Sequence, residues 1–147
     1  MPVIVEPRYD IADLEADLAR VYADYPATDG AGGDQPGLAA NACIEAIRSA
    51  LARDGVFYAG IFNGKPVAGA LVTGPADARR IDLIAVRAIT RGRGVALRLV
   101  DEIARLEQLT GGRRLLVRAG AETGAVLTRL GFESGTPDYS RPLPPAG

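Results

Sequence analysis

The chain has 147 residues, of which 48% are hydrophobic, and its formal net charge is −1. This length suits one domain with one core, and the near-neutral charge argues against a general nucleic-acid-binding surface. The absence of histidine and the single cysteine, Cys43, exclude a histidine-based catalytic triad and a disulfide within the chain, and they argue against a metal site.

A single cysteine is typical of proteins from a reducing compartment, so we expect a cytoplasmic protein in which Cys43 is a small buried residue. No apolar run in the sequence reaches the length of a membrane-spanning helix, and no membrane association is expected. The sequence leaves open whether the protein is a monomer or a dimer.

The first part of the chain predicts a short strand at Val3–Val5 and then a helix. Asp10 has the side chain of a helix N-cap, apolar residues recur after it at helical spacing as far as Tyr22, and the helix is expected to stop near Tyr25-Pro26. Residues 27–37 are rich in glycine, which favours a flexible loop.

A second helix and a hairpin are expected next. The helix runs from Leu38 and is stopped by Gly55. Asn63-Gly64 is the strongest short-range signal for a hairpin, and it lies between two apolar segments that read as strands, Val56–Phe62 and Lys65–Thr73.

The remainder of the chain predicts strand, helix, strand, short helix and one or two last strands, in that order: Arg80–Arg87, a helix from Val95 that ends at Gly111-Gly112, Leu115–Arg118, Thr123–Leu130, and residues after Phe132. A proline-rich flexible tail, 142–147, follows. Hairpins mixed with crossovers indicate an α+β fold, with a mixed sheet and helices on both faces. With no repeat and no long linker, we expect a single domain over 1–147.

The segment Arg91-Gly92-Arg93-Gly94 joins a predicted strand to a predicted helix. Free backbone N–H groups at the start of a helix, together with the helix dipole, form an anion site. Glycine lets a phosphate approach the backbone, and arginine donates to it in a forked geometry. Arg87 and Arg98 add to this cationic stretch. The alternatives are a glycine turn that only connects two elements and a solvated basic surface.

The loop lacks the Gly-Lys-Ser/Thr of a Walker A motif. It resembles instead the acyl-CoA loop of the GNAT superfamily, Gln/Arg-x-x-Gly-x-Gly/Ala, and Leu130-Gly131-Phe132 is similar to the Leu-Gly-Phe that closes the last GNAT helix. The resemblance implies a single GNAT fold with a mixed, mostly antiparallel sheet, and acetyl-CoA as the cofactor. It implies a CoA site formed by Leu83, Ile84, Ala85, Val86, Arg91, Gly92, Arg93, Gly94, Val95 and Ala96.

The sequence supports catalysis less well than it supports CoA binding. Many GNAT enzymes carry a tyrosine five residues before the phenylalanine of Leu-Gly-Phe, and here that residue is Leu127; an asparagine on the preceding strand corresponds to Gly120. Asp82 is the best candidate for a general base, because it precedes the loop on a strand and by strand alternation shares a face with Ile84 and Val86. Weaker candidates are Glu122 and Tyr139.

The stretch Arg87-x-Ile-Thr-Arg-x-Arg-Gly-Val resembles the PanZ family, also called PanM. These GNAT-fold proteins bind acetyl-CoA and then aspartate α-decarboxylase, whose maturation they promote in pantothenate biosynthesis. The resemblance extends to residues 17–25 and 58–63. It implies that Asn63, Arg87 and Arg91 contact the decarboxylase. Ile61 and the extra residues at 27–55 depart from the family pattern. The alternative is an active N-acetyltransferase for a small-molecule or peptide amine, and a weaker one is another phosphate-binding protein.

Overall fold

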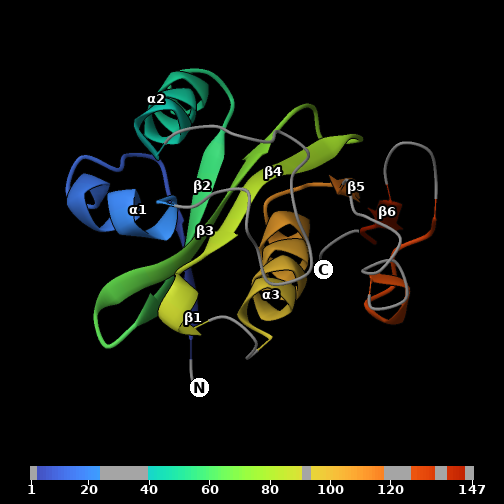
Figure 1. Cartoon of the computed structure of the whole chain (residues 1–147). Coiled ribbons are helices and arrows are strands. Elements are labelled where there is room, and N and C mark those ends of the chain that lie inside the picture. The colour runs from blue at the N-terminus through green and yellow to red at the C-terminus, as the bar shows by residue number, and fades with distance from the viewer. Residues whose placement is uncertain (1–2, 24–39, 91–93, 118–126, 135–138, 145–147) are drawn as a thin grey trace.

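The computed structural model of the protein describes residues 3–23, 40–90, 94–117, 127–134 and 139–144 (Figure 1). The sequence predictions for the loop at 27–37 and for Leu38, Gly120 and Glu122 lie outside these residues, as does the first half of the helix expected at 123–130. Arg91, Gly92 and Arg93 of the predicted CoA loop also lie outside them.

Six strands form one sheet, in which each strand lies beside its neighbour in the sequence. The pairs are antiparallel except for β4 with β5, which is parallel. This confirms the mixed, mostly antiparallel sheet. The strands are β1 (Ile4–Arg8), β2 (Val56–Phe62), β3 (Lys65–Thr73), β4 (Arg79–Val86), β5 (Arg114–Val117) and β6 (Tyr139–Pro142).

Helices cover both faces of the sheet, as expected for the α+β class. Two helices, α1 (Glu15–Val21) and α2 (Ala40–Leu51), share one apolar cluster with the sheet. The long helix α3 (Val95–Leu109) packs into a second cluster on the other face, and the short 3-10 helix η1 (Ala88–Thr90) follows β4. None of the helices that the structure describes is long and apolar enough to cross a membrane.

The hairpin between β2 and β3 has the predicted strand bounds. Asn63 and Gly64 have φ values of 52° and 76°, as a two-residue type I′ loop requires. Cys43 on α2 is buried, and burial raises the pKa of its thiol. The prediction of a small apolar core residue at this position is therefore confirmed.

The first helix is shorter than predicted. It begins at Glu15 instead of directly after Asp10, because the Asp10 carboxylate caps a separate turn, accepting a hydrogen bond from the Ala12 N–H at 2.9 Å. It ends at Val21, before the stop expected near Tyr25-Pro26. The difference at the start arises from a polar contact that apolar spacing does not reveal.

The chain after β5 is held to the sheet further than expected. Pro142 belongs to β6, and Leu143 is buried, with its N–H donating to the Arg113 carbonyl at 2.8 Å. The first residues of the expected flexible tail are therefore part of the fold, because Leu143 supplies apolar surface to the core. The strands β4 and β5 each begin one residue earlier than predicted.

Candidate functional site

The strands β4 and β5 are paired only at their beginnings. Three pairs join Arg79–Ile81 to Leu115–Val117, whereas β4 continues to Val86. On its other side β4 stays paired with β3 to its end, and the Arg87 N–H donates to the Val67 carbonyl at 2.8 Å. Among the described residues, the second half of β4 thus has a strand partner on one side only, which leaves an open edge.

A β-bulge interrupts β4 where this open edge begins. Gly69 lies opposite Ala85 and Leu71 lies opposite Asp82, so Ala70 alone faces two residues of β4. One of these two, Leu83, has a φ of 54° although it is not glycine. A bulge of this kind bends the strand and changes the alternation of its side chains.

The bulge corrects one prediction about Asp82. Ile84 and Val86 pack into the cluster on the α3 face, but they do so together with Ile81. The extra residue shifts the alternation by one, so Asp82 does not share their face. Its cross-strand partner Leu71 belongs to the cluster of α1 and α2, and this register places Asp82, which is partly buried, on that face of the sheet.

The start of α3 has no side-chain cap among the described residues. Gly94 precedes the helix in the left-handed conformation, with φ 72° and ψ 18°, and the first turn contains no acid. A Cβ built on Gly94 meets no atom within 4 Å. The side chains of Val95 and Ala96 are buried, so only the backbone of these residues can contact a ligand. Uncapped N–H groups at a helix start carry a partial positive charge.

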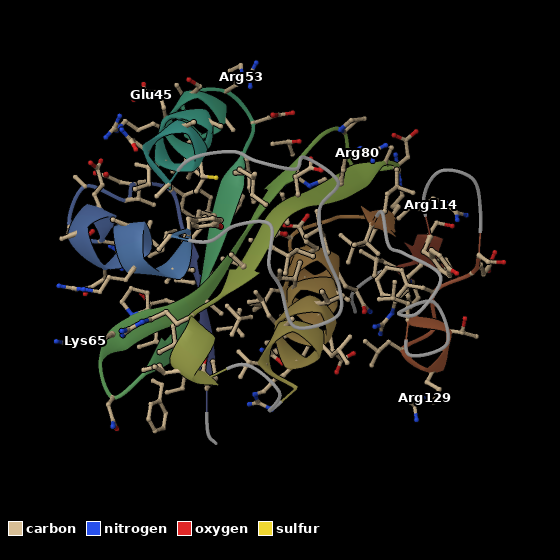
Figure 2. The ribbon with its side chains drawn as sticks, in the orientation of Figure 1. Glu45, Arg53, Lys65, Arg80, Arg114 and Arg129 are labelled. Carbon is tan, nitrogen blue, oxygen red and sulfur yellow. The ribbon has the colours of Figure 1, made fainter. Side chains whose placement is uncertain are left out.

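The remaining predicted residues lie at the same end of the sheet. Asn63 is exposed in the β2–β3 hairpin, and Arg87 is partly buried after β4. The Arg98 Nε donates to the Val3 carbonyl at 3.0 Å, so this side chain joins α3 to the start of β1. In Figure 2, Lys65 marks this end of the sheet and Arg80 marks the other.

Comparisons with known proteins identify the family and the fold. The family model described as the acetyltransferase (GNAT) domain PanZ matches residues 9–121. The chain belongs to the PanZ family of GNAT domains. No curated protein sequence matched it.

Solved structures show the same GNAT fold. The ribosomal-protein-S18-alanine N-acetyltransferase of Escherichia coli matches with a TM-score of 0.72 and 17% identity, over 98% of this chain and 97% of that one. YhbS from E. coli in complex with CoA gives 0.71 and 11%, over 98% and 83%. The phosphinothricin acetyltransferase of Sinorhizobium meliloti in complex with AcCoA gives 0.69 and 16%, over 97% and 89%.

Within this GNAT domain, the position expected for a catalytic tyrosine carries no proton donor. Leu127 is fully buried in the α3-side cluster, so its side chain contributes packing alone. Tyr139 begins β6, opposite Val117, and packs against the same cluster. Of the acid and base candidates within the described residues, Asp82 alone lies beside the open edge of β4.

A polar cluster that sequence reasoning missed occupies the other end of the GNAT domain. The carboxylate of Glu107, near the end of α3, accepts a hydrogen bond from the Tyr58 hydroxyl and one from the Arg79 Nε at 2.7 Å. Glu107 is 2% exposed. Burial, followed by the hydrogen bond to Glu107, raises the pKa of Tyr58 well above its usual range. The sequence contained a signal for a buried carboxylate, because Glu107 follows Ile103 at helical spacing on the apolar face of α3.

A cavity of about 260 Å³ adjoins this polar cluster, far from the start of α3. It is lined by Tyr9, Val56, Gly74, Ala76, Arg79, Glu107, Thr110 and Gly111-Gly112. None of the residues predicted to bind CoA is among them. We therefore assign the candidate ligand site to the open edge of β4 and the start of α3, and the polar cluster to stability.

Proposed function

We propose that this chain binds acetyl-CoA through the start of α3 and the open edge of β4. The observation that carries the proposal is the acid-free first turn of α3, which no described side chain caps and where a Cβ on Gly94 would meet no described atom within 4 Å. Backbone N–H groups at a helix start suit a pyrophosphate. Solved GNAT-fold structures that contain CoA or AcCoA support the choice of ligand.

The residues contribute in two ways. The N–H groups at Gly94, Val95 and Ala96 would hold the phosphates, with Arg91 and Arg93 adding charge. The backbone of Leu83–Val86 would hold the acyl arm by strand-like hydrogen bonds, because the side chains of these residues are all buried. Acetyl-CoA held by these residues would supply an activated thioester.

The role we favour is that of an acetyl-CoA sensor and maturation factor for aspartate α-decarboxylase in pantothenate biosynthesis. Membership of the PanZ family supports this role, as does Leu127 at the position of the catalytic tyrosine. Asn63 and Arg87 lie at the end of the sheet beside the proposed ligand site, where they can contact a partner together with Arg91.

The alternative is an N-acetyltransferase acting on a small-molecule or peptide amine. One observation favours it: Asp82 sits at the bulge, on the face opposite α3, and a carboxylate there can accept a proton from an attacking amine. Positioning alone also accelerates acyl transfer from a thioester. Steady acetylation of an amine, abolished by Asp82→Asn with unchanged acetyl-CoA affinity, would establish this alternative.

The first experiment is a calorimetric titration of the purified protein with acetyl-CoA, followed by co-purification with aspartate α-decarboxylase with and without the ligand. We expect a micromolar Kd and a complex that depends on acetyl-CoA. Binding of the ligand without a complex would favour the acetyltransferase, and absence of binding would refute the assignment of the site.

Two variants test the partner surface. Asn63→Gly keeps the left-handed turn, because glycine adopts positive φ freely, while it removes the side-chain amide. Arg87→Ala removes a cation from the same end of the sheet. Both should weaken the complex, and Asn63→Gly should leave acetyl-CoA affinity unchanged. Arg53→Ala, at the exposed end of α2 (Figure 2), is the matched control and should change neither.

A further inference from the structure

The bulge in β4 holds a leucine in a conformation that it rarely adopts. Leu83 is 3% exposed and has a φ of 54°. A bulge residue with positive φ is usually glycine, because a Cβ is strained there. Some other contact must therefore stabilise this backbone conformation at Leu83.

That contact comes from α1. The hydroxyl of Tyr22, the residue that follows α1, donates to the Leu83 carbonyl at 2.6 Å. Both groups are buried, and the two residues are 61 positions apart in the sequence. A bulge disrupts the ladder of strand hydrogen bonds, and a buried carbonyl without a partner is costly. The hydroxyl thus satisfies the carbonyl and fixes its direction.

The sheet leaves space for this hydroxyl. A Cβ on Gly69 would lie 3.2 Å from the Tyr22 Oη and 2.4 Å from the Phe57 Cζ. Gly69 pairs with Ala85, directly after the bulge. A side chain at position 69 would thus clash with Phe57 and crowd the Tyr22 hydroxyl, so the glycine, the phenylalanine and the tyrosine pack as one unit on the face of α1 and α2.

The position of the bulge connects this unit to the ligand site. Leu83 comes two residues after Ile81, the last residue of β4 that pairs with β5. In a planar trans peptide the C=O and the following N–H point in opposite directions. By holding the Leu83 carbonyl toward α1, Tyr22 directs the N–H of Ile84 away from α1, at the inner end of the open edge.

We propose that Tyr22 is a positioning residue for the acyl group: its hydroxyl sets the bulge, and the bulge sets the protein's preference for acetyl-CoA over free CoA. This inference rests on the proposed function, since it concerns the acyl end of the same ligand. The phosphates, held at the start of α3, are common to both ligands and do not depend on Tyr22.

The test is calorimetry of wild type, Tyr22→Phe and Tyr58→Phe with acetyl-CoA and with CoA. Tyr22→Phe should weaken acetyl-CoA binding roughly tenfold, as for one lost hydrogen bond, and leave CoA binding nearly unchanged. Tyr58→Phe is the matched control. It removes a buried hydroxyl from the other apolar cluster, so it should lower stability without changing the ratio of the two affinities.

An unchanged ratio in Tyr22→Phe, or a wild type without preference for acetyl-CoA, would overturn this inference while CoA binding itself still stood. A wild type that binds neither ligand would overturn both proposals. Backbone NMR of the wild type gives an answer even if the variant does not fold. Acetyl-CoA should shift the amide resonances of residues 82–85 more than CoA does, and identical shifts would contradict the proposal.

Discussion

The two ends of α3 satisfy their backbone groups differently. At the start, no described side chain caps the helix, no acid lies in the first turn, and a Cβ on Gly94 would meet no described atom within 4 Å. At the end, the Thr110 hydroxyl donates to the Leu106 and Glu107 carbonyls at 3.2 Å, and the Gly112 N–H donates to the Glu107 carbonyl at 2.8 Å. The protein thus completes the end of α3 itself, and the start is the end at which we propose that a ligand binds.

The comparison links the end of α3 to the stability of the fold and, as we propose, its start to ligand binding. The end of α3 is fastened to the sheet by the buried Glu107 carboxylate, through Tyr58 on β2 and Arg79 on β4. The start contributes buried Val95 and Ala96 to the core, and its polar contact to the sheet is the hydrogen bond from the Arg98 Nε to the Val3 carbonyl, with no buried carboxylate among the described residues. Substitutions at the two ends should therefore separate loss of stability from loss of binding.

The largest effect is expected at Glu107. Glu107→Ala leaves Arg79 without its carboxylate, and removing one partner of a buried ion pair costs about 3–5 kcal/mol of unfolding free energy. Urea denaturation measures the loss. Glu102→Ala, which breaks an exposed pair with Arg105 on the same helix, is the control and should have little effect. Equal losses in the two variants would mean that burial of Glu107 does not determine the energy.

Tyr58→Phe should have the next largest effect. It removes one of the two donors to Glu107, and a hydrogen bond to a charged group contributes about 1.5–3 kcal/mol. The pKa of Tyr58 is raised in the folded protein, so its contribution is complete below the unfolded value of about 10 and is lost as the pH rises above it. The unfolding free energies at pH 8 and pH 11 should differ less in the variant than in the wild type. An equal difference in the two proteins would show that the Tyr58 hydroxyl does not cause the pH dependence.

The sequence predicted the hairpin well because its signal is local. Asn63-Gly64 fixes a two-residue turn, and the turn fixes the bounds of β2 and β3 on either side. The GNAT fold followed from the order of such local elements, and the family match over residues 9–121 confirms it. Within the candidate site, only the glycine before α3 had a local signal of this kind.

The bulge and the polar cluster could not be predicted in the same way. The φ of Leu83 depends on Tyr22, from α1, and on Gly69, from β3, so no window around Leu83 contains the cause. Strand alternation therefore assigned Asp82 to the wrong face. The partners of Glu107 likewise come from β2 and β4, and they are brought together only when the sheet and α3 pack.

Substituting the glycine at each end of α3 compares the two ends directly. Gly94 and Gly111 have φ values of 72° and 97°, and a Cβ on either meets nothing within 4 Å. Alanine at either position should cost about 1–2 kcal/mol through backbone strain. Only Gly94→Ala should also weaken acetyl-CoA binding, roughly tenfold, because its Cβ occupies the space in front of the helix start. Equal affinities in the two variants would refute the site at this end.

The smallest effect is expected from a charge pair at the surface. The carboxylate of Glu15 on α1 accepts two hydrogen bonds from the Arg48 guanidinium on α2, at 2.6 and 3.0 Å. These bonds lower the pKa of Glu15, so the pair adds stability above the unfolded pKa and loses it as the pH falls through the lower, folded value. Because both side chains are partly exposed, water and salt screen the pair.

Arg48→Gln should return the Glu15 pKa to its usual range, and a carbon-detected NMR titration of the Glu15 carboxyl measures that change. The melting temperature at pH 7 should hardly move, in contrast to the large fall in Glu107→Ala. Added salt should raise the Glu15 pKa in the wild type and not in the variant, since only the wild type has a cation to screen. If Arg48→Gln destabilised the protein as much as Glu107→Ala, burial would not be what distinguishes the two carboxylates.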